Sequence, residues 1–171
     1  MALYVLVVFG FNNQLRFNAE GMFNLPVGKR DLNAKMIRKA KRFIDRICAD
    51  SYDFRQGDFR AFDVESLGDH DFVYADPPYL IATATYNENG GWTKDDEKNL
   101  LEFLDCIDGR GANFALSNVT ESNGKTNELL KAWIARNSDR YRVVDIARDY
   151  SNANYQRKNI GVSHEVLIVN Y

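Results

Sequence analysis

Asp76, Pro77, Pro78 and Tyr79 directly follow a strand-like run, Phe72–Ala75. A chain that needs only a turn can make one with a single proline and a glycine. The simplest interpretation is a strand-ending turn, in which Asp76 accepts a hydrogen bond from a nearby backbone N–H and the prolines stiffen the exit. Chance is a poor explanation, because this tetrapeptide is expected in on the order of one in a thousand chains of this length.

A second interpretation gives these residue types a chemical role. The exocyclic amine of adenine is a weak nucleophile because its lone pair is delocalised into the ring, and two acceptors aimed at its N–H bonds would draw that pair back onto nitrogen. The Asp76 carboxylate and the Pro77 carbonyl could be these acceptors, since proline fixes the direction of the backbone. Tyr79 could then stack on a base swung out of the duplex.

Composition narrows the class of protein. The 171 residues are 45% hydrophobic with a net charge of -2, which indicates a soluble globular domain rather than a disordered chain or a wholly basic nucleic-acid binder. Cys48 and Cys106 lack a CxxC spacing, and the only histidines are His70 and His164. We therefore expect no structural zinc site, no other metal site and no Cys–His nucleophile.

The opening run, residues 1–9, is apolar. It is too short to span a bilayer and lacks the basic start and the cleavage site of a signal peptide, so we expect a cytoplasmic protein. Because the chain opens on apolar residues with no polar lead-in, this run could begin in the middle of a structural element. Truncation at the amino end would explain such a start.

The rest of the chain alternates between strand and helix patterns. Thr93 and Asp96 form a variant capping box that begins one helix. The predicted strands are 52–55, 71–75, 112–118, 141–147 and 164–170, and the predicted helices are 34–47, 94–107 and 126–136. This order predicts an α/β fold with a largely parallel sheet, in which ligands gather at the carboxyl ends of the strands. Asp76 stands at one of those ends.

Two segments have features of a nucleic-acid surface. Residues 9–31 are rich in Asn, Gly and aromatic residues, which predicts turns and short strands that expose aromatic side chains and Arg16. Residues 29–46 hold eight Lys or Arg against two Asp. The basic outer face of the helix at 34–47 is the simple result of solvation if that helix is considered alone, and phosphate contact is the alternative.

A series of short motifs runs through nearly the whole chain. They are NNQLRFN and FNLPVGK within 12–29, GDF at 57–59, DFVYADPPYL at 71–80, YN at 86–87, W at 92, LSN at 116–118 and HEVLIVNY at 164–171. In this order they resemble the DNA adenine-N6 methyltransferases of the Dam family, most closely the bacteriophage type. The resemblance implies a Rossmann-like methyltransferase sheet, S-adenosylmethionine as the cofactor and double-stranded DNA as the substrate.

The resemblance also implies roles for individual residues. The catalytic loop of the family corresponds to Asp76, Pro77, Pro78 and Tyr79. Asp58 and Phe59 match a strand-end pair that holds the adenine moiety of S-adenosylmethionine, Phe59 by stacking, and Asp76 also belongs to the cofactor-binding set. From the residues alone, a core aromatic is an equally good interpretation of Phe59.

The implied DNA contacts lie near the amino end. The resemblance assigns residues 1–33 to the carboxyl-terminal part of the target recognition region and residues 34–171 to a partial catalytic core. The implied contacts are Phe11, Asn12, Gln14, Arg16, Asn18, Pro26, Lys29 and Arg30. Phe11 and Asn12 would wedge into the base stack, and Arg16 would read a guanine edge. GATC-like sites are the family expectation, although the family usually has an apolar residue at the position of Gln14.

The chain also departs from the family. It has no F-x-G-x-G turn and no lysine-bearing cofactor segment before the recognition motifs. We therefore expect an incomplete cofactor pocket, an uncovered sheet edge and a missing half that could lie on another chain. A catalytically inactive DNA-binding remnant is the alternative function, and methylation of protein, RNA or free bases is disfavoured by the match at 9–29. Trp92 is interpreted as packing, and Tyr86 and Asn87 as loop contacts.

Overall fold

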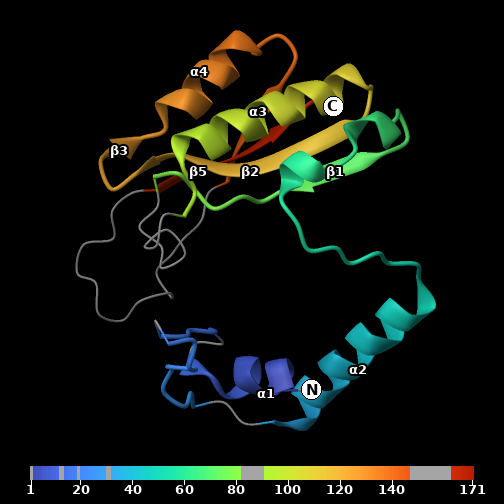
Figure 1. Ribbon diagram of the computed structural model, residues 1–171, viewed down its shortest axis with the longest axis vertical. Helices are drawn as coiled ribbons and strands as arrows, with labels where there is room; N and C mark the ends of the chain where they lie inside the picture. Colours follow the sequence, from blue (N-terminus) through green and yellow to red (C-terminus); the bar gives the residue numbers. More distant parts are fainter. Residues whose placement is uncertain (1, 12–13, 19, 30–31, 82–90, 147–162) are drawn as a thin grey trace. The chain divides into compact units, whose positions relative to one another are not determined.

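The computed structural model describes residues 2–11, 14–18, 20–29, 32–81, 91–146 and 163–171 (Figure 1). The chain divides into two compact units, Met1–Gln56 and Gly57–Tyr171. Within the described ranges, no helix is long and apolar enough to cross a membrane. The helix at 34–49 belongs to the first unit, together with the amino-terminal segment.

Two helices frame the first unit. They are α1, Ala2–Phe9, and α2, Ala34–Ala49, which confirms the helix predicted at 34–47. Asn33 begins α2 because its side-chain oxygen accepts the backbone N–H groups of Lys35 and Met36, at 3.0 and 3.1 Å. The Tyr4 hydroxyl donates to the Met36 carbonyl at 2.9 Å, which ties α1 to α2.

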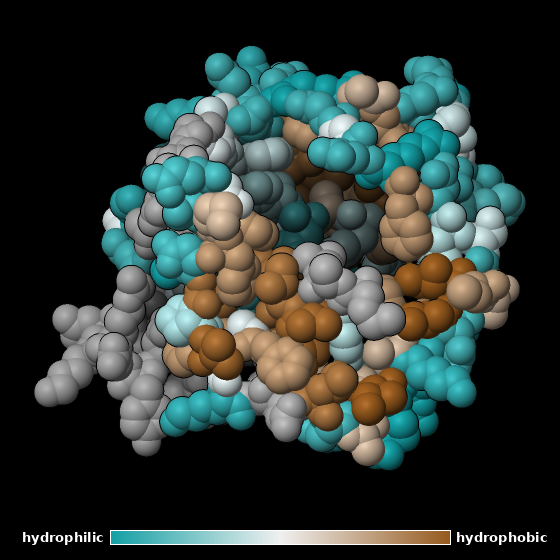
Figure 2. Space-filling model, turned by 60° about the horizontal axis from the view of Figure 1, so that its bottom comes forward, coloured by the Kyte–Doolittle hydropathy of each residue, from teal (hydrophilic) through white to brown (hydrophobic). Residues whose placement is uncertain are grey.

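The described part of the segment between these helices forms turns and isolated bridges, where the sequence predicts turns and short strands. Gly10 pairs with Val27, and Phe17 pairs with Phe23, both antiparallel. The first crossing requires glycine, because a Cβ on Gly28 would lie 2.8 Å from the Gly10 carbonyl oxygen. The predicted exposure of aromatic side chains is confirmed for Phe17, and Figure 2 shows hydrophobic side chains gathered on the surface of the molecule.

The second unit holds a mixed α/β arrangement. Its elements are η2 Phe59–Ala61, η3 Val64–Ser66, β1 Phe72–Ala75, α3 Lys94–Gly109, β2 Asn113–Ser122, β3 Lys125–Thr126, α4 Glu128–Arg136, β4 Arg142–Ile146 and β5 Ser163–Val169. The helices and strands predicted from residue 71 onward are confirmed. The strand predicted at 52–55 is wrong: Tyr52 and Phe54 stack on each other at the surface, and no neighbouring strand hydrogen-bonds this segment within the described residues.

The short strand β3, Lys125–Thr126, is not predicted from the sequence. Asn123 and Gly124 both have positive φ, at 51° and 76°, and join β2 to β3 in a tight hairpin. Positive φ at both central residues is the conformation that Asn-Gly pairs favour. The β2 strand is therefore longer than the predicted 112–118 and turns back on itself before α4.

The sheet has the order β1-β2-β5-β4, with β3 paired to the end of β2. The β1 strand is parallel to β2, whereas β5 is antiparallel to both β2 and β4. The prediction of a largely parallel sheet is therefore corrected: β1, β2 and β4 share one direction, but β5 lies between two of them and opposes both. The last two strands were predicted without a helix between them, and such neighbours pair antiparallel because no crossover is needed.

The helices α3 and α4 cover the same face of the sheet (Figure 1). The fully buried core side chains come from α3, α4, β2 and β5, and include Leu104, Ile107, Phe114, Leu116, Leu130 and Ile168. The β1 strand ends the sheet, and its Phe72 and Tyr74 side chains are more than half exposed.

Candidate active site

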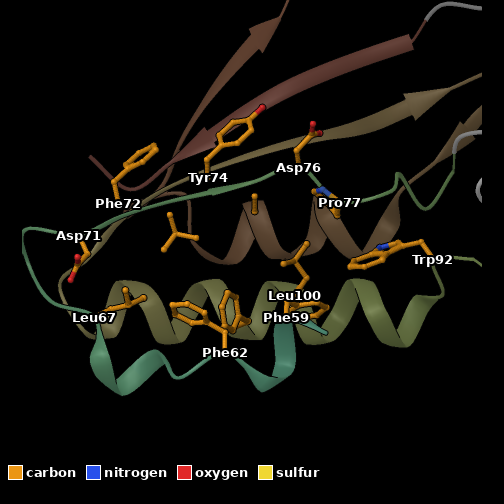
Figure 3. A pocket seen from close by; sticks show the side chains of 13 residues that line it. Phe59, Phe62, Leu67, Asp71, Phe72, Tyr74, Asp76, Pro77, Trp92 and Leu100 are labelled. Atoms are coloured by element: carbon orange, nitrogen blue, oxygen red, sulfur yellow. The ribbon is translucent and has the colours of Figure 1, made fainter. Parts of the chain in front are cut away.

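Asp76 lies where the sequence places it, directly after β1 at its carboxyl end. Side chains alternate along a strand, so Val73 and Ala75 pack against the core. Figure 3 shows Tyr74 and Asp76 on the side of β1 away from α3. The strand cannot continue its hydrogen bonding through Pro77, because proline has no N–H.

The Asp76 carboxylate is exposed, and no donor among the described residues is paired with it. The interpretation in which Asp76 accepts from a nearby backbone N–H is therefore wrong for the described part of the chain. Pro77, Pro78 and Tyr79 are half-buried. The Tyr79 hydroxyl lies 3.3 Å from Oγ of Ser117 on β2, and either oxygen can donate. This contact ties Tyr79 to the neighbouring strand.

A pocket of about 540 Å³ lies beside this turn, within the second unit (Figure 3). Its volume is in the usual range for small-molecule sites. The lining residues are Phe59, Phe62, Leu67, Asp71, Phe72, Val73, Tyr74, Ala75, Asp76, Pro77, Trp92, Leu100 and Phe103. The lining is mainly aromatic and aliphatic, with two carboxylates at its edge, and this suits a planar ring that carries N–H donors.

Phe59 is both a core residue and a pocket wall. Its ring centroid lies 5.6 Å from that of Phe103 and 5.9 Å from that of Trp92, and it packs against the core cluster. The guanidinium carbon of Arg60 lies 4.9 Å from the same centroid. The two interpretations of Phe59 from sequence are therefore compatible.

The predicted surroundings of Asp58 are corrected. Asp58 does not end a strand: it caps the short helix η2, and its two oxygens accept from the backbone N–H and from Nη1 of Arg60, at 2.9 and 2.7 Å. The pocket lining includes Phe59 but not Asp58. The local sequence favours the cap because an aspartate accepts readily from the N–H two residues on.

The capping box predicted at the start of α3 is confirmed. The Thr93 hydroxyl accepts from the Asp96 backbone N–H at 3.1 Å, and the Asp96 carboxylate accepts from the Thr93 backbone N–H at 2.8 Å. Arg60 also donates to Asp96, which connects η2 to α3. Hydrogen bonds from the Thr93 hydroxyl first, and then from Arg60, lower the pKa of Asp96 to about 2.

Sequence reasoning missed Glu97. This side chain is fully buried and accepts hydrogen bonds from Trp92, Asn118 and Asn127. The available signal was its spacing: Leu100, Leu101 and Leu104 follow at three, four and seven positions, so Glu97 occupies the apolar face of α3. A carboxylate on that face must be buried with partners.

The predicted DNA-contact residues that the structure describes lie in the first unit. Nε of Arg16 donates to the Asn24 carbonyl at 2.8 Å, and the Asn24 N–H donates to the Arg16 carbonyl at 2.8 Å. The Asn18 side chain accepts from the backbone of Glu20 and Met22, which holds a turn. The remaining described members, all exposed, are Phe11, Gln14, Pro26 and Lys29.

Four residues singled out in the sequence lie outside the described residues: Asn12, Arg30, Tyr86 and Asn87. The structure brings together Phe59, Trp92 and the turn that begins at Asp76, all in the second unit. Trp92, interpreted from sequence as packing, is a wall of the same pocket.

Comparison with known proteins identifies the lineage of this chain. The chain is 39% identical over 175 residues to the modification methylase StsI of Streptococcus sanguinis, and 37% identical over 175 residues to the type II methyltransferase M.FokI of Planomicrobium okeanokoites. Each alignment covers 99% of this chain and 26% of the relative, so the chain spans about a quarter of the length of these proteins.

A phage enzyme matches less extensively. The DNA N-6-adenine-methyltransferase of Escherichia phage P1 is 29% identical over 117 residues, which cover 66% of this chain and 15% of that protein. The D12 class N6 adenine-specific DNA methyltransferase family matches residues 1–148, which include the turn at Asp76 and most of the pocket unit. This chain therefore belongs to the D12 class N6 adenine-specific DNA methyltransferase family.

Proposed function

We propose that this chain carries the base-holding site of an S-adenosylmethionine-dependent DNA methyltransferase that modifies N6 of adenine, at GATC-like sites. One observation carries the proposal: Asp76, an exposed carboxylate with no paired donor among the described residues, and the adjoining Pro77 stand at the carboxyl end of β1, beside an aromatic pocket. The family and the relatives named as modification methylases support it.

The turn has the groups that the chemistry needs. Asp76 accepts one N–H of the adenine amine, and the Pro77 carbonyl accepts the other, so both stabilise the positive charge that grows on nitrogen. Tyr79, whose hydroxyl is held near Ser117 on β2, presents its ring to the flipped base. These three roles follow from the family resemblance and agree with the positions of the residues.

The pocket suits the purine end of the cofactor. Phe59, Phe62 and Trp92 line it with aromatic rings, which favour a planar heterocycle, and Asp76 lies at its edge. Asp58, next to Phe59, would accept from the cofactor only alongside its bonds to Arg60. S-adenosylmethionine would supply the methyl group.

The first unit would hold the duplex. We propose that residues 1–33 belong to the target recognition region, that residues 34–171 belong to a Rossmann-like catalytic core, and that the basic face of α2 meets phosphates. The exposed Phe11 and Phe17 rings and the Arg16 guanidinium, of which only Nε is paired among the described residues, support this role. Arg16 would read a guanine edge.

Calorimetric titration with S-adenosylmethionine, without and then with a GATC duplex, tests the proposal. We expect binding, and transfer of a labelled methyl group to the duplex by this chain or by a complex that contains it. Asp76→Asn should abolish transfer and keep duplex binding, whereas Asp69→Asn, an exposed aspartate outside the pocket, should change neither. Turnover by Asp76→Asn would refute the mechanism. Duplex binding with no cofactor binding would instead favour the DNA-binding remnant.

The recognition role of Arg16 has its own variant in the same assay. Arg16→Ala should reduce discrimination between GATC and altered duplexes by about 1 to 3 kcal/mol, the usual value of a paired base contact. An equal loss on every sequence would reassign Arg16 to phosphate contact. Lys29→Ala is the matched control, because a single phosphate contact should weaken all duplexes alike.

A further inference from the structure

Glu97 places a buried carboxylate at the start of α3, with both of its oxygens in use. Oε1 accepts from Nδ2 of Asn118 at 3.0 Å and from Nδ2 of Asn127 at 2.7 Å. Oε2 accepts from Nε1 of Trp92 at 2.6 Å. Amide and indole nitrogens of this kind only donate, so the carboxyl oxygens of Glu97 are the acceptors in all three contacts. Its place in the first turns of α3 favours a negative charge.

The two asparagines cannot turn over to suit a different partner. Oδ1 of Asn118 accepts from the Val119 backbone N–H at 2.7 Å, and Oδ1 of Asn127 accepts from the Leu130 backbone N–H at 3.1 Å, as the cap of α4. Both asparagines are buried. Their Nδ2 groups are therefore fixed as donors, and β2 and α4 together determine where the carboxylate of Glu97 lies.

The third donor, Trp92, differs from these two because it lines the pocket. Its indole is half-buried and shares the lining with Asp76 and Pro77 (Figure 3). Its ring lies 5.9 Å from that of Phe59, at a tilt of 37°. The hydrogen bond to Glu97 thus connects a wall of the site to the buried centre of the second unit.

We propose that Glu97 is a positioning residue, which fixes the Trp92 indole as a wall of the pocket so that Trp92 contacts the aromatic ring of the bound ligand. The identity of that ring as a purine rests on the proposed function, whereas the positioning of Trp92 does not. The role of Glu97 is indirect, because its oxygens face Asn118, Asn127 and the Trp92 indole nitrogen rather than the pocket.

An amide at this position cannot satisfy both sides. In Glu97→Gln, one oxygen can still accept from the two fixed asparagines, but the NH₂ group then faces the indole N–H of Trp92. The opposite rotamer leaves two buried donors facing NH₂, which costs more than leaving one. Trp92 is therefore the partner that Glu97→Gln should release.

The chain contains two tryptophans, so fluorine NMR of the 5-fluorotryptophan-labelled chain tests the positioning directly. Trp92→Phe assigns the two resonances. Glu97→Gln should shift and broaden the Trp92 resonance and leave that of Trp133 in place. The matched control is Asp105→Asn, because Asp105 accepts from the Trp133 indole, and it should leave Trp92 unchanged. An unshifted Trp92 resonance in folded Glu97→Gln would overturn the proposal.

A measurement on the unmodified chain covers the case in which Glu97→Gln does not fold. The Trp92 indole N–H should exchange with deuterium far more slowly than that of an unprotected half-buried tryptophan, because a buried carboxylate accepts it. Exchange at the rate of free tryptophan would show that the hydrogen bond does not hold the ring, and would overturn the positioning.

Titration of the labelled chain with adenosine separates the proposal from the function on which its ligand rests. Adenosine should move the Trp92 resonance, and Glu97→Gln should bind it at least several-fold more weakly. If adenosine leaves both resonances in place while Trp92 still follows Glu97, the positioning stands and a purine ligand is wrong. If adenosine moves Trp92 equally in both chains, with equal affinity, the role of Glu97 is wrong.

Discussion

Two tryptophans donate their indole N–H groups to carboxylates on the same helix, α3, yet the pairs lie in different surroundings. Trp92 donates to Glu97 at 2.6 Å, and Trp133 donates to Asp105 at 2.9 Å. Trp133 is only 2% exposed and lies among core rings, whereas Trp92 is half-buried in the pocket wall. The exposure of the carboxylates is reversed: Glu97 is fully buried, and Asp105 reaches the surface.

This difference in burial indicates what fixes the orientation of each tryptophan ring. Trp133 packs against Phe114 and Tyr141, with centroids 6.3 and 4.9 Å away, so its orientation is set by neighbours on several sides. Trp92 lines the pocket, and its indole N–H donates to the buried Glu97. We infer that packing orients the core indole and that a buried hydrogen bond orients the pocket indole.

The largest expected difference between the two sites is in stability. Trp133→Ala should lower the free energy of unfolding by about 3 to 5 kcal/mol, since it opens a cavity in a packed core. Trp92→Ala should cost clearly less, because Trp92 is less buried than Trp133 and lines the pocket. Urea denaturation of both variants measures this, and equal losses would contradict the assignment of Trp133 to packing and Trp92 to the wall.

Glu97→Gln should come next. It removes the acceptor of the half-buried Trp92 indole N–H, and the loss of a hydrogen-bond partner inside a protein typically costs about 1 to 3 kcal/mol of unfolding free energy. Glu102→Gln is the matched control on the same helix: its side chain is 60% exposed, so a change within about 0.5 kcal/mol is expected. If the two substitutions cost the same in urea denaturation, the hydrogen bonds of Glu97 contribute nothing net.

The sequence predicts those parts of the second unit that local rules determine. The cap at Thr93, the helix that it begins and the end of β1 just before Asp76 depend on residues close together in the chain, and all three are confirmed. The insertion of β5 between β2 and β4 depends on pairing across the sheet, which no local pattern records. The strand predicted at 52–55 is wrong for the same reason, because a strand exists only where a partner hydrogen-bonds it.

The same distinction between local and long-range determinants applies to the candidate site. The family resemblance supplied Asp76, Pro77 and Phe59, and the structure places these three on one pocket. It did not supply Glu97, because the three donors come from positions 92, 118 and 127 and meet only after folding. A charged residue at a core position of a helix predicts a buried hydrogen-bond network, although the sequence alone does not identify the partners.

Asp96, which is also on α3, should contribute to the free energy of unfolding in a way that depends on pH. Its folded pKa, about 2, lies below the ordinary 3.8, so the stability it contributes is present above pH 3.8 and is lost as pH falls through about 2. Asp96→Asn should therefore be less stable than the unmodified chain near neutral pH, and the difference should shrink over this window. Unfolding free energies across the acid range measure it. Asp95→Asn is the control, and a difference that does not vary with pH would contradict the assignment.

The smallest effect is expected for Asp105→Asn. Oδ1 of Asp105 accepts from both the Trp133 indole and the Tyr141 hydroxyl, each at 2.9 Å, while Oδ2 faces Arg136, whose side chain is 67% exposed. Burial, and then the bond to Asp105, raise the pKa of Tyr141, so its hydroxyl remains a donor.

An asparagine at position 105 can keep its carbonyl oxygen on the two inner donors and turn its NH₂ group to the surface. Only an exposed ion pair is lost, which is worth less than about 1 kcal/mol in urea denaturation. A loss as large as that of Glu97→Gln would mean that burial of the donors alone determines the cost. A smaller loss would mean that an amide can replace the carboxylate of Asp105, because one oxygen accepts both inner hydrogen bonds. At Glu97 an amide cannot do so, because both carboxylate oxygens accept hydrogen bonds.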